Sequence, residues 1–231
     1  MKLEICANSF LSAKNAQEVG AHRIELCSEL SVGGVTPSYG LLKKIVEELT
    51  IETFVLIRPR SGNFVYSEAE LDIMKQDIQL CKELGCHGIV SGVLNEDKTI
   101  DFDRTKKLVE LSKPLPFTFH RAFDEVPNPI EALTQLVDLG IDRILTSGQA
   151  QKAVDGIDLL KILKDKAGNQ LIILPGGGIT SENAILFRKA GFQELHSSAS
   201  SNMSLDNGIF SEPITFSDTK KIRAMLDKMF D

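Results

Sequence analysis

Thiols and ionisable side chains end several short apolar runs of this 231-residue sequence. Cys6 ends "LEIC", Cys27 ends "RIELC" and His120 ends "PFTFH". Cysteine thiolates bind soft metal ions such as Cu(I), and a histidine close to a carboxylate can transfer protons. These residue types therefore indicate metal binding or acid–base chemistry, provided that the fold brings them together.

Four segments with a common spacing indicate how the chain is organised. Gly20, Gly85, Gly140 and Gly191 each follow a stretch with helical apolar spacing, and each leads into a short β-rich run. Glycine often ends a helix in this way before the next strand. Four further apolar runs also fit strands, namely "LEICAN", "TFVLIRPR", "PFTFHRAF" and "LIILPGGGI". The sequence thus predicts eight strands.

Helices are expected in the segments between these strands. Ser67 and Glu70 form a capping box, and Asn128 followed by Pro129 begins another helix. Alternating strands and helices imply a parallel sheet, and eight units favour a single-domain (β/α)8 TIM barrel over residues 1–231. The alternative is an open doubly wound sheet, but "ICANSF" after the first strand lacks the usual glycine-rich nucleotide turn.

Composition excludes several classes of partner. The net charge of -6 and the pI near 5.3 argue against nucleic acid and anionic membranes, which both need clustered Lys and Arg. No segment has the length and apolarity of a signal peptide or a membrane span. We therefore expect a cytoplasmic protein with reduced thiols, whose partners are small molecules or other copies of the chain in a homo-oligomer.

The barrel predicts where the chemistry lies, because TIM barrels build their sites at the carboxyl ends of the strands. Alternation along the strands turns Cys6, Glu25 and Cys27 inward, together with Arg58, Arg60, His120, His196 and Ser198. Glu25, Arg58, His120 and His196 then form a candidate catalytic set for acid–base chemistry. The alternative is a polar network that only fills the barrel mouth.

A glycine-rich turn suggests an anion site in the same mouth. Gly176, Gly177 and Gly178 leave the seventh strand, and Ser197 and Ser198 end the eighth. TIM barrels commonly bind phosphate at this position through backbone N–H groups. Arginine forks grip such anions, so Arg60 joins these five residues as a predicted anion ligand, as Arg58 also could. A tight turn, and ion pairs of the arginines with Glu4 or Glu25, are the alternatives.

Seven segments resemble, in order and over almost the whole chain, the CutC family, which is named for a role in copper homeostasis. They are "EICANS", "RIELCSELSVGGVTPSYGLL", "VLIRPRSGNFVYS", "TFHRAFDEVPNP", "RILTSGQA", "PGGGI" and "ELHSSA". The resemblance implies a cytosolic, oligomeric TIM barrel and a Cu(I) site formed by Cys6 and Cys27. His22, Lys98 and Ser200 depart from the usual family pattern of Asp, Gly and Arg.

Three functions are compatible with these observations. A copper homeostasis protein that binds Cu(I) through Cys6 and Cys27 comes first. An enzyme of the isomerase, lyase or hydrolase type, acting on a small anionic metabolite with or without a phosphate, is the alternative. A sensor that binds such a metabolite without turning it over is the third. Cys81 and Cys86 fit simple packing in the core.

Overall fold

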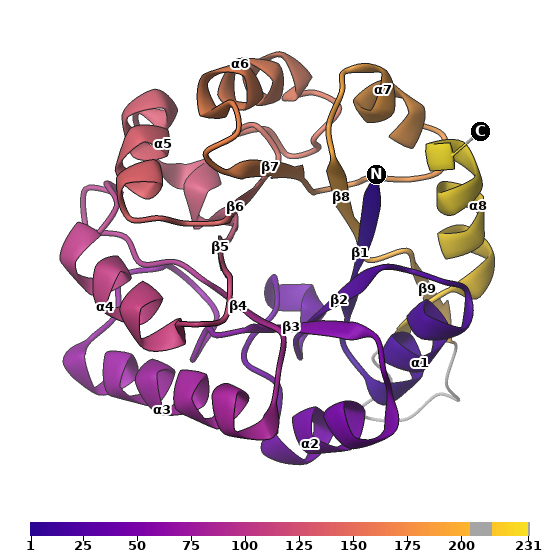
Figure 1. Cartoon of the computed structure of the whole chain (residues 1–231), viewed down its shortest axis with the longest axis horizontal. Coiled ribbons are helices and arrows are strands. Elements are labelled where there is room, and N and C mark those ends of the chain that lie inside the picture. The colour runs from indigo at the N-terminus through magenta and orange to yellow at the C-terminus, as the bar shows by residue number, and fades with distance from the viewer. Residues whose placement is uncertain (204–213, 231) are drawn as a thin grey trace.

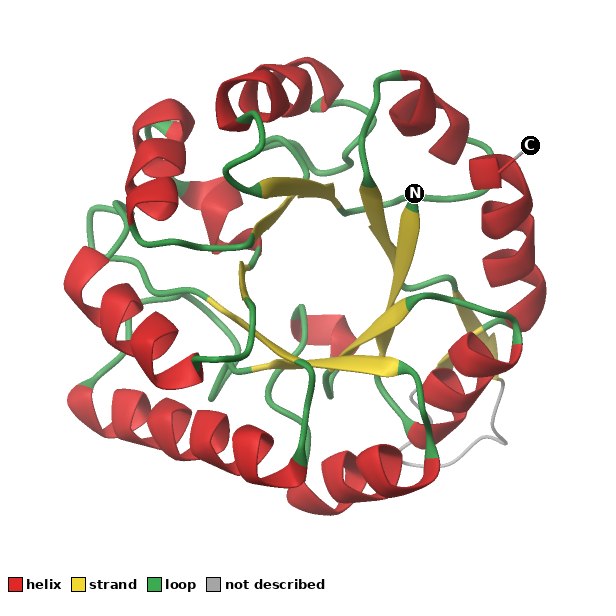
Figure 2. Ribbon diagram, in the orientation of Figure 1, coloured by secondary structure: helices red, strands yellow, loops and turns green. Residues whose placement is uncertain are grey.

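Eight parallel strands form a closed ring with helices around it (Figures 1 and 2). The structure is a computed structural model that describes residues 1–203 and 214–230. The ring consists of β1 (Lys2–Ala7), β2 (Arg23–Leu26), β3 (Glu52–Leu56), β4 (Gly88–Ser91), β5 (Phe117–Phe119), β6 (Arg143–Thr146), β7 (Ile172–Pro175) and β8 (Glu194–Ser197). The predicted (β/α)8 TIM barrel is confirmed.

Neighbouring strands pair in chain order, and the last strand returns to the first. Lys2 of β1 lies opposite Glu194 of β8, while Glu4 lies between Arg23 of β2 and His196 of β8. Between β7 and β8 a single parallel bridge joins Gly176 to His196. His196 therefore belongs to the joint that completes the ring.

Helices cover the outside of the ring. They are α1 (Phe10–Glu18), α2 (Tyr39–Glu48), α3 (Glu68–Leu84), α4 (Phe102–Ser112), α5 (Pro129–Asp138), α6 (Ile157–Ala167), α7 (Ala184–Lys189) and α8 (Thr219–Phe230). Two 3-10 helices, η1 (Leu30–Val32) and η2 (Arg121–Glu125), lie in loops. None of the helices in the described residues is long and apolar enough to cross a membrane.

The local signals that predicted the helices are present in the structure. The Ser67 hydroxyl accepts from the Glu70 N–H, and the Glu70 carboxylate accepts from the Ser67 N–H, which completes the capping box of α3. Asn128 caps α5 through its side-chain oxygen, which accepts from the Glu131 N–H, and Pro129 is the first residue of the helix. The four glycines at positions 20, 85, 140 and 191 all have positive φ, between 71° and 84°, as the turn from helix to strand requires.

The core has two parts. Apolar strand residues such as Leu3, Ile5 and Ile24 point outward and pack under the helices. Inside the ring, charged side chains such as Glu4, Arg23 and Glu25 lie beside a small apolar cluster of Cys6, Cys27, Phe54, Leu56 and Val90. The interior thus combines ionisable and apolar groups, while the outer layer supplies most of the hydrophobic stabilisation.

A short hairpin that the sequence analysis did not predict precedes α8. It pairs β9 (Ser200–Met203) with β10 (Ile214–Ser217) in antiparallel fashion. Its second strand rests against the start of the chain, because Asn8 donates to the Thr215 hydroxyl and the Ser217 N–H donates to the Ser12 hydroxyl. The hairpin therefore ties the end of the barrel to α1.

Candidate functional site

A cavity of about 230 Å³ opens at the carboxyl ends of the strands. Nine of the twelve residues predicted for a site line it, namely Cys6, Glu25, Arg58, His120, Gly177, Gly178, His196, Ser197 and Ser198. Apolar side chains, among them Phe64 and Leu56, complete its wall. Cys27, Arg60 and Gly176 are not part of the lining.

The two predicted metal ligands lie side by side, with Cys6 in the cavity lining and Cys27 buried behind it. Cys6 comes from β1 and Cys27 directly follows β2, and their Sγ atoms are 3.6 Å apart. Both thiols are buried, Cys27 completely and Cys6 with 6% exposure. The hydrogen bond with Cys27, burial and the nearby Glu25 raise the pKa of Cys6 well above its usual value. At neutral pH Cys6 is therefore a thiol and not a thiolate.

His196 lies between two carboxylates next to Cys6. Its Nδ1 is 2.7 Å from Glu4 Oε1, and its Nε2 is 3.5 Å from Glu25 Oε2. Burial alone would lower the pKa of His196, but the hydrogen bond to Glu4 and the charge of Glu25 outweigh it and raise this pKa. Burial and the charge of Glu4 raise the pKa of Glu25, against the pull of His196. His196 and Glu25 therefore both hold a proton more strongly than they would in water.

His120 lies on the other side of the ring, directly after β5. Its Nδ1 accepts from the Ala122 N–H at 3.2 Å, and its ring packs on Gly92, where a Cβ would come within 2.7 Å. Burial, with the charge of Arg58 as a second cause, lowers the pKa of His120 to about 3. The ring is therefore neutral at neutral pH, with its proton on Nε2.

Arg58 and Arg60 follow β3 but differ in position. Arg58 is buried, and its guanidinium donates to the carbonyls of Val32, Gly34 and Gly62, which fastens two loops at the mouth. Arg60 points away from the cavity and donates to Glu70 of the capping box. The structure thus brings Arg58 into the site and places Arg60 outside it.

The glycine-rich turn and the serines after β8 form one corner of the cavity. Gly177 and Gly178 have positive φ of 105° and 70° and line the cavity. Gly176 instead forms the bridge to His196 and donates to the Thr146 carbonyl. The Ser197 hydroxyl donates to the Ile179 carbonyl, and the Ser198 hydroxyl donates to Ser200. The corner therefore offers mainly backbone groups to a ligand.

Arg121 is a cavity residue that the sequence analysis did not select. Its guanidinium donates to Asp124 and to the Ser147 hydroxyl, both at 2.8 Å, and its side chain keeps 43% exposure. A Cβ at Gly177 would lie 3.4 Å from this guanidinium. The i,i+3 spacing of Arg121 and Asp124 was a signal that could have identified a fixed cation at the mouth.

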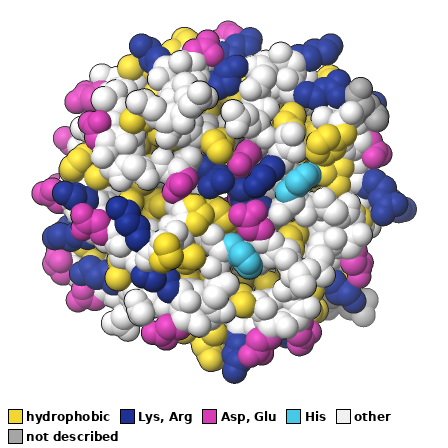
Figure 3. Space-filling view, in the orientation of Figure 1, with side chains coloured by type: hydrophobic (Ala, Val, Ile, Leu, Met, Phe, Trp, Pro, Cys, Tyr) yellow, Lys and Arg dark blue, Asp and Glu magenta, His cyan; other side chains and the backbone are white. Residues whose placement is uncertain are grey.

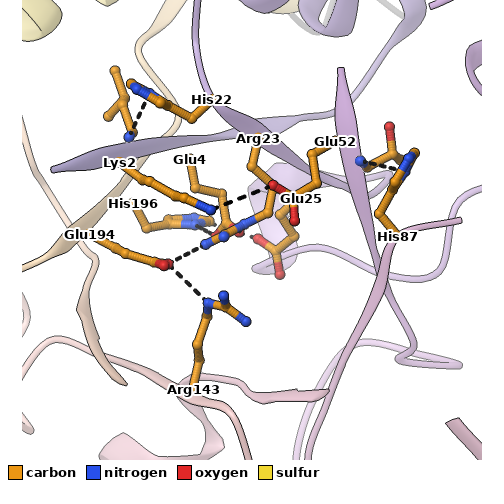
Figure 4. Close-up of polar contacts among 12 residues, drawn as sticks. Lys2, Glu4, His22, Arg23, Glu25, Glu52, His87, Arg143, Glu194 and His196 are labelled. Atoms are coloured by element: carbon orange, nitrogen blue, oxygen red, sulfur yellow. Dashed lines mark hydrogen bonds and ion pairs between the residues drawn. The ribbon is translucent and has the colours of Figure 1, made fainter. Parts of the chain in front are cut away.

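A second polar network lies deeper in the barrel (Figure 4). Arg23 pairs with Glu4 and Glu194, and Arg143 also pairs with Glu194. Burial would raise the pKa of Glu4, yet Arg23 and His196 hold it at about 2. On the face shown in Figure 3, basic and acidic side chains and two histidines gather near the centre. The sequence analysis did not predict this deeper network, although strand alternation places Arg23 and Glu194 on the inward face.

The fold is a TIM barrel, and its cavity lies at the carboxyl ends of the strands, where barrels of this class build their sites. The chain belongs to the CutC family, whose model matches residues 1–201. The copper homeostasis protein cutC homolog of Mus musculus is 47% identical over 90% of this chain and 76% of its own length. The human homolog is 46% identical over 86% of this chain and 73% of its own length.

A solved structure supports the same assignment. The CutC protein of Streptococcus agalactiae superposes with a TM-score of 0.81 at 36% identity, covering 86% of this chain and 98% of that one. The thiamine phosphate pyrophosphorylase of Pyrococcus furiosus has a TM-score of 0.61 at 15% identity, over 99% of this chain and 95% of that one, and shares the fold alone. The resemblance found in the sequence is thereby confirmed.

Proposed function

We propose that this protein binds Cu(I) in the cytosol through Cys6 and Cys27 and acts in copper homeostasis. The observation that carries the proposal is the 3.6 Å separation of the two Sγ atoms at the edge of a cavity. Relatives named for copper homeostasis support it. Thiolates are the ligands that Cu(I) prefers, and a reducing compartment keeps both the thiols and the Cu(I) state available.

The sulfur separation also indicates how many donors take part. With metal–sulfur bonds of about 2.3 Å, two thiolates 3.6 Å apart subtend an angle of about 100° at the metal, far from linear. Such an angle leaves space for a third donor. Cys6, Glu25 and His196 hold their ligand atoms within 4.8 Å of one another, so Glu25 or His196 can provide it. We therefore place Cu(I) between the thiol pair and these two side chains.

Copper binding must displace protons at this site. The pKa of Cys6 is raised by its hydrogen bond to Cys27, by burial and by Glu25, so the thiolate forms only when a metal ion replaces the proton. Glu25 and His196 lie close enough to receive it. The affinity for Cu(I) should therefore increase from pH 6 to pH 8, because fewer protons compete at the higher pH.

The test is an anaerobic titration with Cu(I) against a chromogenic chelator. The wild type should bind one equivalent, and Cys6→Ala with Cys27→Ala should weaken binding more than about a hundredfold. His196→Gln should cost about tenfold if its ring is a third or supporting ligand.

A second buried cysteine pair provides the matched control. Cys81 and Cys86 are both buried at the end of α3, away from the cavity lining, and the Cys86 N–H donates to the Cys81 carbonyl. Cys81→Ala with Cys86→Ala should leave Cu(I) binding intact. The proposal is wrong if the chelator keeps the copper from the wild type, or if both double variants lose binding equally.

A further inference from the structure

His120, Arg58 and Phe64 line a part of the cavity that the proposed copper site does not use, called here the His120 wall. His120 is 5% exposed, and its Nε2 is buried without a hydrogen-bond partner among residues 1–203 and 214–230. Since Nδ1 accepts from the Ala122 N–H, the neutral ring must carry its proton on Nε2. His120 therefore presents a buried donor in a cavity, and leaving such a donor without an acceptor is costly.

Arg58 adds a positive charge next to this donor. Three of its N–H groups donate to backbone carbonyls, and the Tyr66 hydroxyl lies close enough to the guanidinium to accept a further hydrogen bond. The Arg58 guanidinium and the His120 ring both lie 4.9 Å from the centre of the Phe64 ring, so one aromatic side chain positions both. One N–H donor without a partner and one positive charge thus lie against the same aromatic ring.

His120 lies across the ring from Cys6. Cys6, Glu25 and His196 come from the adjacent strands β1, β2 and β8, whereas β5, which precedes His120, lies four strands away from β1 around the ring. Arg58 follows β3 and lies between the two sides, since its guanidinium donates to Gly34 next to Cys27. Arg121 also lines the cavity, but Asp124 pairs with its charge. An occupant that satisfies these groups must accept hydrogen bonds and carry negative charge.

We propose that the cavity binds a small organic carboxylate through His120 Nε2–H, next to the Arg58 guanidinium. A carboxylate oxygen accepts from the imidazole N–H, and a single negative charge matches one guanidinium beside a neutral imidazole. The cavity of about 230 Å³ corresponds to roughly eight water molecules, which limits the ligand to a few carbon atoms. The site is separate from the copper ligands and does not depend on copper being bound.

The experiment follows the histidine side chains of the metal-free protein by nitrogen-15 NMR during titration with sodium acetate. Sodium chloride holds the ionic strength constant, and inorganic phosphate is titrated in a parallel arm. Acetate should shift the Nε2 resonance of His120 saturably. His22 and His87 are internal controls, because their Nδ1 atoms also accept backbone N–H groups but neither residue lines the cavity.

Variants test whether the acetate-dependent NMR shift depends on the His120 Nε2–H group. His120→Phe should weaken acetate binding about tenfold or more, the loss expected for a hydrogen bond to a charged group. His120→Gln keeps an N–H donor and should retain part of the affinity, while His87→Gln should change nothing. Equal shifts at all histidines, no saturable shift, or a response to phosphate alone would each overturn the carboxylate assignment. The copper titration is independent, so either proposal can fail without the other.

Discussion

The two walls of the cavity each contain one histidine, and the two rings have opposite electrostatic surroundings. His196 lies between the carboxylates of Glu4 and Glu25, which raise its pKa despite burial. His120 is equally buried but lies beside Arg58, and its pKa is lowered to about 3. One ring is an ion-pair partner and the other a neutral donor. The residue type alone therefore does not assign the role: burial, helped by Arg58, keeps His120 neutral, whereas two carboxylates outweigh burial at His196.

The difference extends to how the charges are balanced. Around His196, the carboxylates of Glu4, Glu25 and Glu194 face Arg23, Arg143 and the His196 ring, although Nη1 of each arginine also lacks a partner among the described residues. Around His120, no carboxylate of the described residues pairs with the charge of Arg58. The first side therefore has its own counter-charges, whereas an anionic ligand would supply one to the second.

The largest loss of stability is expected when the ion pairs of Glu4 with Arg23 and His196 are removed. Glu4→Gln removes a buried charge that Arg23 and His196 both use, so the protein should lose about 3–5 kcal/mol of unfolding free energy. The pKa of His196 should fall at the same time. Urea denaturation and histidine NMR measure the two effects. Glu52→Gln, which removes a carboxylate 4.0 Å from Lys2 at the surface, should cost less than about 0.5 kcal/mol, and a similar cost for both would contradict the prediction.

The pH dependence of stability should separate the two histidines. For His120 the unfolded chain binds a proton near pH 6.5 while the folded protein does not, so the wild type loses stability as pH falls from 6.5 toward 3. The wild type should therefore lose about 1.4 kcal/mol per pH unit relative to His120→Gln in this range. Urea titrations at pH 4, 5 and 6 measure this difference.

His196 should show the reverse sign. Its raised pKa means that the folded protein holds the proton more strongly, so its contribution is fully present below pH 6.5 and is lost as pH rises through the folded pKa. The advantage of the wild type over His196→Gln should accordingly decrease above pH 6.5. Stability curves that run parallel for both variants would show that the two environments do not differ as the structure indicates.

A smaller effect is expected at Gly92, which supports only the His120 wall. A Cβ at this position would lie 2.7 Å from His120 Nδ1, so Gly92→Ala must displace the ring. We expect a loss of about 1–3 kcal/mol by overpacking, together with an altered His120 resonance and an unchanged His196 resonance. Thermal unfolding and NMR measure these outcomes, and movement of both histidine signals would contradict a local effect.

Much of the fold could be predicted because its signals are local. Helix caps at Ser67 and Asn128, and glycines with positive φ before four of the strands, repeat at the spacing of a barrel. The β9–β10 hairpin had no such signal, since Ser200–Met203 is short and polar and its partner strand lies beyond residues 204–213. Pairing of that kind depends on contacts across the fold.

The site was predictable only as far as the strands extend. Alternation placed Cys6, Glu25 and His196 correctly in the barrel because these residues belong to strands. Beyond β3, which ends at Leu56, it was right for Arg58 and wrong for Arg60, because the rule of alternation ends with the strand. Beyond that point hydrogen bonds decide, and those of Arg58 reach three loop carbonyls while Arg60 reaches Glu70.

The contact between Glu4 and His196 joins residues that are 192 positions apart. During synthesis, Glu4 leaves the ribosome long before its partner exists, and so do Cys6 and Glu25. The bond that holds the imidazole beside the thiol can form only after β8 has docked against β1, the contact of highest sequence separation in the ring. A nascent or incompletely folded chain thus contains both cysteines without the histidine beside them, and the three side chains come together only in the finished barrel.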